Sequence, residues 1–346
     1  MIRQENVDDS KRGWVCVKQL LVTGPCVTEW VDVPEPECAV DGLVVRARLT
    51  AVSTGTEIRV FRGIAVDERG EFLHETVPFE LPAPNGYSMV GTVEAVGDSV
   101  EGFSVGDRVF LPAAHAEVAA MPADLAVRLP ESVSDEAAVF LNILEVSHIA
   151  LRRGDPTPGC QLAVLGQGVI GLAGVAYGRA FGLETIGIDP ASARREIGLA
   201  MGATAVLDPT AEDFSERIAA WGDGGGADVV LEAASGWDAI RTGMDIARTD
   251  ATIVVVARHT DVPRFNPVGH PYLGKRLNLV TSYGYPADGG RWDCSSSRRL
   301  TLELLAAGRI SLEPLITDRI DCNELPTIYG RLAAGEPSIV GVVVSW

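Results

Sequence analysis

The sequence lacks three features that would assign it to a common class at once: long apolar runs, closely spaced cysteines and excess positive charge. No stretch reaches the roughly 18 consecutive apolar residues of a membrane-spanning helix, so no span is predicted. The opening residues, MIRQENVDDSKRGW, are charged and lack the apolar core of a secretory signal. We expect them to form a solvated tail.

Cysteine is sparse and scattered. None of the 6 cysteines forms a C-x-x-C pair or stands beside a histidine at ligand spacing. Reduced, structural thiols of a cytoplasmic protein are therefore the simplest expectation. The positions are Cys16, Cys26, Cys38, Cys160, Cys294 and Cys322.

Positive charge is also scarce, since 29 lysine and arginine residues face 47 aspartate and glutamate residues, a net charge of −18. Such a chain repels nucleic acid, and no basic stripe compensates. The acidic balance does not identify a substrate, because it bears mainly on solubility. We expect a small-molecule partner, and neither a nucleic acid nor a membrane.

Two patterns divide the chain. Up to about residue 134, short runs such as 43–49, 91–96 and 108–111 are separated by glycine, proline and aspartate, which predicts a barrel-like β domain. From residue 135 strands alternate with helices, as in a doubly wound parallel sheet. The predicted class is α/β, with residues 1–134 and 291–346 in the first domain and 135–290 in the second.

The second pattern predicts a helix over 135–152, with Ser134 as its N-cap and Gly154 closing it. The last run, 341–345, is expected to be a strand that returns to the first domain. The other predicted helices are 169–181, 192–201, 212–221, 237–247 and 300–307, and the strands are 162–165, 185–188, 205–207, 228–232 and 252–256.

A glycine motif between strand 162–165 and helix 169–181 predicts a dinucleotide site. Gly166 permits the tight turn, Gly168 lets a pyrophosphate approach the backbone, and Gly171 lets helix and strand pack closely. The helix N-terminus then offers free N–H groups to the phosphates. The predicted cofactor set is Gly166, Gln167, Gly168, Val169, Ile170 and Gly171, completed by Asp189, Arg194, Ala233 and Ala257.

Asp189 favours NAD over NADP. It follows strand 185–188, 18 residues beyond Gly171, near the position of a ribose-binding acid. A carboxylate there accepts hydrogen bonds from the ribose hydroxyls and repels a 2′-phosphate. Arg194 and Arg195 are the counter-argument, because arginine can bind that phosphate; otherwise they belong to a solvated helix face.

Taken together, the sequence resembles the medium-chain dehydrogenase/reductase family, the zinc-type alcohol-dehydrogenase-like proteins. The resemblance extends to NGYSMVGTVEAVGDSVEGFSVGDRV, similar to the family's GHExxGxVxxVGxxVxxxxxGDRV, and to KRLNLVTS, similar to its KxLxIxGS. It implies a GroES-like β-barrel domain and a Rossmann domain that transfers a hydride between a nicotinamide and its substrate. It also implies a dimer or a tetramer.

The metal ligands of the family are missing. Thr54 stands in place of the cysteine of G-x-C-G-[ST]-D, and Tyr87-Ser88 in place of the His-Glu pair. The four-cysteine lobe expected after Phe110 is absent as well. Because hydroxyl groups are poor zinc ligands, we predict no metal at either site. The STGTE segment is similar to that of a zinc-lacking subgroup that includes bacteriochlorophyllide dehydrogenases.

Without zinc, side chains must stabilise the reacting oxygen and move its proton. Thr56 matches the family's proton-relay hydroxyl, although it could be an ordinary turn threonine. Tyr87 could donate to the substrate oxygen or merely fill the vacated volume. Glu57 could act as a base, or be a structural carboxylate bound to backbone or arginine. His148, three residues after Glu145, could form a relay with it or lie at a surface or domain interface.

Further histidines, His115, His259 and His270, fall in predicted loops and are expected at the surface. The segment 258–272 follows the last central strand, so we expect it to wall the substrate pocket. Three functions stay open: an NAD-dependent alcohol or polyol dehydrogenase, an enoyl or quinone reductase using NADPH, and a redox-neutral nucleotide-binding protein. The apolar run 276–282 is the expected free sheet edge and predicts a homodimer, with a tetramer as second choice.

Overall fold

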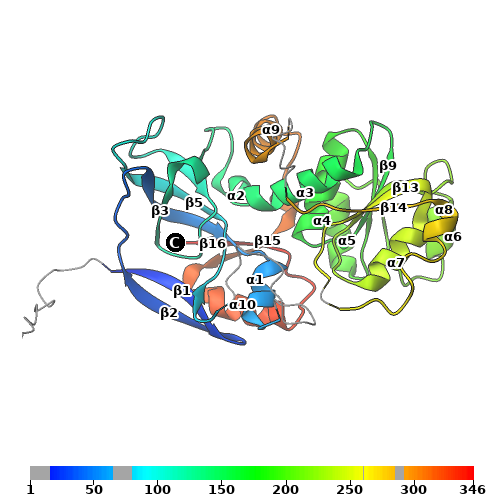
Figure 1. Cartoon of the computed structure of the whole chain (residues 1–346), viewed down its shortest axis with the longest axis horizontal. Coiled ribbons are helices and arrows are strands. Elements are labelled where there is room, and N and C mark those ends of the chain that lie inside the picture. Colours follow the sequence, from blue (N-terminus) through cyan, green and yellow to red (C-terminus); the bar gives the residue numbers. More distant parts are fainter. Residues whose placement is uncertain (1–15, 65–79, 260, 285–291) are drawn as a thin grey trace, which may run out of the picture.

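A computed structural model describes residues 16–64, 80–259, 261–284 and 292–346. The predicted N-terminal tail lies outside these residues. Figure 1 shows two lobes, a β-rich lobe and a lobe built on a parallel sheet, with helices α2 (Asp135–Ala138) and α3 (Leu141–Gly154) running between them. Within the described residues, no helix is long and apolar enough to cross a membrane.

The β-rich lobe contains two sheets. The larger is 7-stranded, in the order β15-β16-β3-β5-β6-β8 with β7 paired to β3, and the smaller has the order β2-β1-β4. Their strands are β1 (Cys16–Gly24), β2 (Val27–Pro34), β3 (Gly42–Ala51), β4 (Ala83–Pro84), β5 (Met89–Val96), β6 (Arg108–Leu111), β7 (Val118–Pro122), β8 (Val127–Arg128), β15 (Ile316–Asp321) and β16 (Gly341–Ser345).

The sequence predicted an all-β first domain, but in the structure this domain also contains helices. The STGTE segment begins helix α1 (Thr56–Phe61), which packs against α10 (Leu325–Ala333). Phe61 and Tyr329 join the two helices through an edge-to-face ring contact with centroids 5.4 Å apart. A six-residue helix was missed because so short an apolar stretch has no detectable helical period.

The second lobe confirms the predicted doubly wound sheet. All six strands are parallel, in the order β11-β10-β9-β12-β13-β14, so the strand order reverses between β9 and β12. The strands are β9 (Gln161–Leu165), β10 (Glu184–Ile188), β11 (Ala205–Leu207), β12 (Ala227–Glu232), β13 (Ala247–Val255) and β14 (Asn278–Thr281); the helices are α4 (Val169–Ala180), α5 (Ser192–Met201), α6 (Phe214–Ala219), α7 (Trp237–Ile246) and α8 (Tyr272–Lys275).

The helix predicted over 135–152 is in fact broken in two. The N-cap is confirmed, since Ser134 Oγ accepts from Ala137 N at 3.2 Å, but the chain leaves helical geometry at Phe140. The Val139 carbonyl freed by the break accepts the Ser88 hydroxyl at 2.5 Å. A tertiary partner therefore compensates the break. The left-handed residue that ends α3 is Asp155, not Gly154, whose missing Cβ instead leaves room for Val229.

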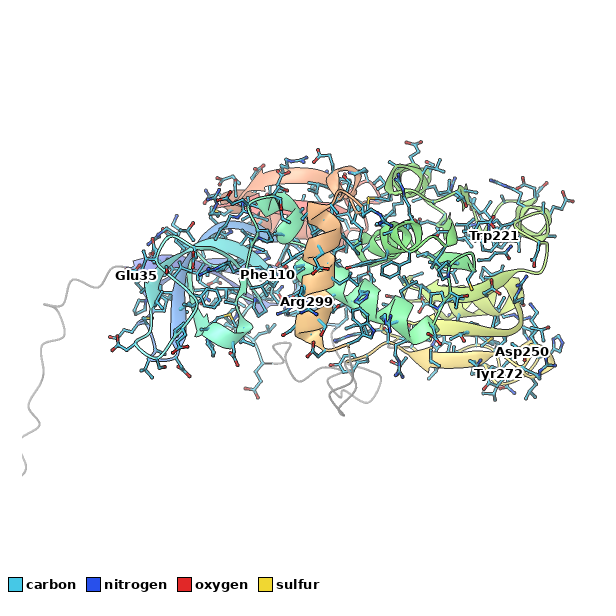
Figure 2. The ribbon with its side chains drawn as sticks, turned by 90° about the horizontal axis from the view of Figure 1, so that it is seen from above. Glu35, Phe110, Trp221, Asp250, Tyr272 and Arg299 are labelled. Carbon is cyan, nitrogen blue, oxygen red and sulfur yellow. The ribbon has the colours of Figure 1, made fainter. Side chains whose placement is uncertain are left out.

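The last part of the chain returns to the β-rich lobe, as expected. Helix α9 (Cys294–Ala306) lies across the junction of the lobes (Figure 2), where Arg298 binds Glu145 of α3 at 2.6 Å and lies over the Phe110 ring of β6. Strand β16 then pairs with β3, and its partner β15 was not predicted. The short 3-10 helices are η2 (Ala123–Leu125), η3 (Glu313–Leu315) and η4 (Cys322–Glu324).

Candidate functional site

The glycine turn after β9 has the geometry of a dinucleotide cradle. Gly166 has φ +86°, and a Cβ there would lie 2.9 Å from the backbone of Ala233 and Ala234. A Cβ on Gly171 would lie 1.8 Å from the Gly166 carbonyl oxygen. Only glycine fits either position, so the turn brings the ends of β9 and β12 together at the point where the strand order reverses.

Gly168 is the N-cap of α4 and provides no side-chain cap. A Cβ at Gly168 would meet nothing within 4 Å, so the space in front of the helix is open. The first N–H groups of α4, including those of Val169 and Ile170, lack intrahelical partners and can bind the pyrophosphate of a dinucleotide. The residues present thus fit a nicotinamide cofactor.

Asp189 anchors the glycine turn. Its carboxylate accepts from the backbone N–H of Gln167 at 2.8 Å and from that of Ala191 at 2.9 Å. Arg195 is bound to the Asp189 and Pro190 carbonyls and to Asp208, and Arg194 donates to the Pro337 carbonyl at 3.1 Å. Both arginines therefore already have partners inside the chain.

The side chain of Gln167 points away from the cofactor space. It is fully buried and donates to the Val164 carbonyl at 3.0 Å. Added Cβ atoms at Gly187 and Gly198 would lie 2.6 and 2.8 Å from its Oε1, so these glycines make room for the amide. Only the backbone of Gln167 faces the predicted site.

A buried carboxylate, Glu232, organises the turn that carries Ala233. Its Oε1 accepts from the N–H groups of Ala234 and Ser235 at 2.8 and 2.9 Å, and its Oε2 lies 2.8 Å from His259 Nε2. Ala257 N donates to the Glu232 carbonyl at 3.0 Å. His259, expected at the surface, is thus nearly buried, because the preceding strand positions a carboxylate that the sequence could not pair with it.

On the β-rich lobe, the hydroxyl groups of Ser53 and Thr56 lie beside that of Tyr87, a residue that the resemblance places at one of the family's metal-ligand positions. Tyr87 donates a short hydrogen bond to Ser53 Oγ, and the side chain of Thr56 lies close enough to the phenol to lower its pKa slightly. Burial raises the pKa of Tyr87, so the phenol stays protonated near neutral pH. Asn142 of α3 holds the backbone in place by donating to the Tyr87 carbonyl at 2.6 Å.

Glu57 lies behind these hydroxyls and is completely buried. Its Oε1 accepts from Ser53 N at 2.7 Å, while Oε2 accepts from the Tyr329 hydroxyl at 2.5 Å and lies 2.9 Å from His115 Nε2. Of the two roles considered for Glu57, this arrangement favours the structural one, because both carboxylate oxygens are bound by other groups of the β-rich lobe.

His115 was predicted to be exposed, which is wrong: it is 0% exposed. Its Nδ1 lies 2.8 Å from Thr50 Oγ1, which also accepts from the Trp346 indole at 2.9 Å. A Cβ on Gly86 would lie 2.7 Å from the ring, so His115 supports the turn that precedes Tyr87. Its side-chain partners come from positions 50 and 57, and no local pattern connects them with His115.

His148 is buried in a different place. Its Nδ1 lies 2.6 Å from Ser297 Oγ of α9, and its ring packs against Tyr177, Phe181 and Trp292. Glu145 is bound by Arg298 instead, so of the two alternatives for His148 the structure favours packing at an interface between helices over a relay with Glu145. Burial and the charge of Arg152 lower the pKa of His148 to about 4.

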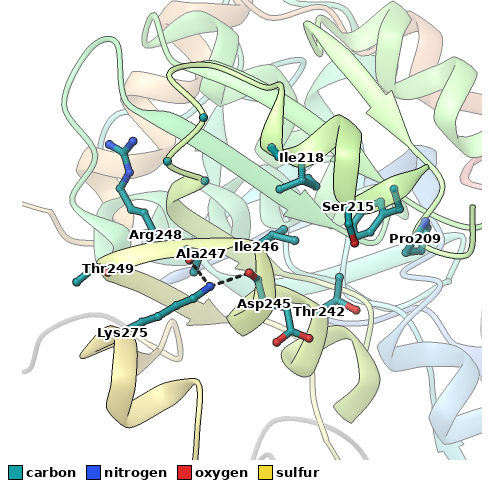
Figure 3. Close-up of a pocket in the computed structure, with 15 residues that line it drawn as sticks. Pro209, Ser215, Ile218, Thr242, Asp245, Ile246, Ala247, Arg248, Thr249 and Lys275 are labelled. Atoms are coloured by element: carbon teal, nitrogen blue, oxygen red, sulfur yellow. Dashed lines mark hydrogen bonds between the residues drawn. The ribbon is translucent and has the colours of Figure 1, made fainter. Parts of the chain in front are cut away.

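A cavity of about 540 Å³ lies at the opposite edge of the parallel sheet, at the amino ends of β12 and β13 (Figure 3). There the Lys275 ammonium donates to the carbonyl groups of Met244, Asp245 and Ala247, at the end of α7. The glycine turn follows the carboxyl end of β9, so this cavity is separate from the cofactor edge. Among the described residues, no group of three or more potential metal ligands occurs.

Comparison with known proteins identifies the class. Residues 41–131 match the alcohol dehydrogenase GroES-like domain and residues 169–294 the zinc-binding dehydrogenase domain. The chain therefore belongs to the zinc-type alcohol-dehydrogenase-like branch of the medium-chain dehydrogenase/reductase family. It is an oxidoreductase of the type that acts on alcohols.

Its relatives include Probable D-xylulose reductase A of Aspergillus terreus, 26% identical over 88% of this chain and 92% of that one. Among solved structures, a protein of Sinorhizobium meliloti assigned as a zinc-binding dehydrogenase and bound to NADP has a TM-score of 0.80 at 21% identity, covering 96% and 100% of the chains. An alcohol dehydrogenase of Escherichia coli complexed with NADH has a TM-score of 0.78 at 20% identity, covering 96% and 99%.

Proposed function

We propose that this chain is a zinc-independent, NAD(H)-dependent oxidoreductase that interconverts a secondary alcohol and a ketone on a polyol or sugar-like substrate. The observation that carries the proposal is the Tyr87–Ser53–Thr56 hydroxyl cluster, in which Tyr87 stands at a position of the family's metal ligands. Ser88 is committed to the Val139 carbonyl, so it offers no ligand either. The similarity of the STGTE segment to that of a zinc-lacking subgroup also supports this proposal.

In this proposal the hydroxyl cluster does the work of the metal. The bound nicotinamide supplies or accepts the hydride. Tyr87, protonated because burial raises its pKa, donates to the substrate oxygen and delivers a proton to the forming alkoxide during ketone reduction. In alcohol oxidation the same hydroxyl oxygen accepts that proton while its own passes to Ser53 Oγ, and the Ser53 hydroxyl releases its proton to bulk water; ketone reduction reverses these transfers. Thr56 orients the phenol, and Glu57 holds Ser53 through its backbone N–H.

NAD is the proposed cofactor because Asp189 lies at the end of β10, where the adenosine ribose is expected, and because both nearby arginines bind other groups. Replacing Asp189 with alanine should lower NADH affinity by about 10- to 100-fold, the loss expected for charge-assisted hydrogen bonds. NADPH affinity should fall less or rise. Tighter binding of NADPH than of NADH by the wild type would contradict the assignment.

Elemental analysis and cofactor titration test the proposal together. We expect far less than one zinc per chain, activity that survives chelators, and NADH-dependent reduction of ketones in preference to enones. Tyr87→Phe should lower kcat by about 100-fold or more, within the range for loss of a general acid, while NADH binding stays intact. Stoichiometric zinc, or enones as the better substrates, would refute it.

We also propose a cytoplasmic homodimer. Strand β14 is an edge of the parallel sheet, and Leu279 on it is 37% exposed. Pairing with the β14 of a second copy would satisfy the open edge and cover this side chain. Light scattering should give twice the 36.7 kDa chain mass. Leu279→Pro should weaken the dimer if the N–H of that residue faces the partner.

A further inference from the structure

The backbone of the segment that carries Tyr87 is bound to the junction of α2 and α3. The Tyr87 carbonyl accepts from Asn142 Nδ2 at 2.6 Å, and the Ser88 hydroxyl donates to the Val139 carbonyl at 2.5 Å. The helix break at Phe140 frees that carbonyl, so the break serves the two residues at the reacting hydroxyl. The position of Tyr87 therefore depends on what holds the Asn142 amide.

The Asn142 amide has a second partner, on helix α9. Arg298 Nη2 donates to Asn142 Oδ1 at 3.0 Å. An asparagine side chain can present either its oxygen or its nitrogen to a neighbour, whereas a guanidinium has only donors. The amide oxygen must therefore face Arg298, and the amide nitrogen is left to donate to the Tyr87 carbonyl. Arg298 thus sets the orientation that the Tyr87 backbone needs.

Arg298 is itself fixed by its surroundings. Its Nε donates to Glu145 Oε2 at 2.6 Å, and the two side chains are only 13% and 12% exposed. The guanidinium also lies over the Phe110 ring, 5.7 Å from its centroid. Burial and the Glu145 charge raise the pKa of Cys294 to about 11, so the thiol stays protonated and donates to the same carboxylate at 3.6 Å. A planar group with these partners is preorganised to bind the amide.

We propose that Arg298 is a positioning residue for the reaction: by orienting the Asn142 amide, it holds the Tyr87 backbone so that the phenol faces the substrate oxygen. The inference rests on the proposed function, in which Tyr87 is the general acid. Arg298 acts through Asn142 and not by contact with the substrate. A displacement of about 1 Å in a reacting group can cost about 100-fold in rate, so a bond at the Tyr87 backbone matters to kcat.

Three variants break the connection at different points. Arg298→Met keeps apolar packing and removes every donor, Arg298→Lys keeps a charge beside Glu145 without the planar fork, and Asn142→Asp keeps an acceptor for Arg298 but cannot donate to Tyr87. Because Arg298→Met leaves Glu145 buried without its partner, the other two variants test the same bond with the charge pair kept. Arg299→Met, at the exposed next residue of α9 (Figure 2), is the matched control.

The first experiment measures hydrogen exchange of the backbone amides of residues 86–89 in the NADH-loaded protein, and needs no substrate. Arg298→Lys and Asn142→Asp should speed exchange about three- to tenfold, the effect of losing one hydrogen bond, while the control matches the wild type. The Kd of NADH should stay within about twofold in all of them. Exchange as slow in both variants as in the wild type overturns the inference.

The second experiment measures kcat with NADH and a ketone panel of D-xylulose, D-fructose and 3-hydroxybutan-2-one. Arg298→Lys should lower kcat about tenfold in the wild type and less than twofold in Tyr87→Phe, because a residue that acts through the phenol loses its effect once the hydroxyl is gone. A purely structural role lowers kcat by the same factor in both backgrounds and overturns the inference. A Tyr87→Phe variant with the wild-type kcat would instead refute the proposed function alone, since hydrogen exchange still reports whether Arg298 holds the Tyr87 backbone.

Discussion

Each lobe contains one buried carboxylate paired with a histidine, and the two pairs differ in how completely they are enclosed. Glu57 and His115 in the β-rich lobe are 2.9 Å apart, with side chains 1% and 0% exposed. Glu232 and His259 in the parallel-sheet lobe are 2.8 Å apart, with side chains 0% and 9% exposed. In both pairs the other carboxylate oxygen accepts from backbone N–H groups.

The outer nitrogen of each histidine shows the difference. His115 Nδ1 bonds to Thr50, whereas His259 Nδ1 is buried and has no partner among the described residues. The Glu57 pair is closed by Tyr329, so its role is to hold the Tyr87 turn rigid. In the Glu232 pair, His259 instead packs against the Trp237 ring, with centroids 5.0 Å apart, and its Nδ1 has no described partner to close the pair. We therefore expect the Glu57–His115 pair, whose groups all have partners, to govern stability. We expect the Glu232–His259 pair, which has a nitrogen without a described partner, to govern ligand binding.

The largest effect should come from removing Glu57. Glu57→Ala leaves the Ser53 N–H, the Tyr329 hydroxyl and the His115 ring without their common acceptor. We expect a loss of about 3–5 kcal/mol in the free energy of unfolding, the usual cost of breaking a buried pair. Denaturant unfolding measures it, with exposed Glu131→Ala as the control. A loss of unfolding free energy below about 1 kcal/mol would show that the hydrogen bonds around Glu57 do not stabilise the fold.

Gly86→Ala tests whether His115 supports the Tyr87 turn. The new Cβ would lie 2.7 Å from the His115 ring at φ +97°, so steric and backbone costs add to about 2–4 kcal/mol. Gly102→Ala is the matched control, because Gly102 has φ +86° but no neighbour within 4 Å of the added atom. It should cost only about 1–2 kcal/mol. If Gly86→Ala and Gly102→Ala lose the same stability in thermal unfolding, the His115 ring moves away from the new Cβ at no cost and does not support the turn.

His148 sharpens the comparison, since it is a buried histidine without a carboxylate. Burial lowers its folded pKa to about 4 from 6.5, so between these values the unfolded state binds more protons. The stability it contributes is complete above pH 6.5 and is lost as the pH falls toward 4, by about 2–3 kcal/mol. His148→Gln should remove this part of the acid-side slope. If the wild type and His148→Gln lose the same unfolding free energy between pH 7 and pH 4, a buried neutral ring at His148 is contradicted.

The smallest effect on stability, and the clearest on binding, is expected at Glu232. Glu232→Gln keeps an acceptor for the turn but weakens the hold on His259, and Ala233 packs against Gly166. The Kd of NADH should rise about three- to tenfold, corresponding to about 1 kcal/mol. Glu57→Gln should leave that Kd unchanged. If both variants weaken NADH binding equally, the division of roles between the pairs is wrong.

The sequence by itself determined the elements whose signals are local. Gly166, Gly168 and Gly171 follow a strand and begin a helix, so they predicted the cofactor turn, and the alternating pattern predicted five of the six parallel strands within a few residues. The sixth, β14, was expected as the free edge. These features depend on neighbours within about 30 residues, where backbone conformation and hydrophobic period leave a direct trace.

Only the tertiary structure decided which groups meet behind and beside the site. Glu57, His115 and Tyr329 come from positions far apart, and Thr50 and Trp346 complete their network. Asn142 and Arg298 likewise meet from two separate helices. The partner of a buried polar group is set by how sheets and helices pack, and packing brings distant segments together without any spacing that a sequence pattern could record.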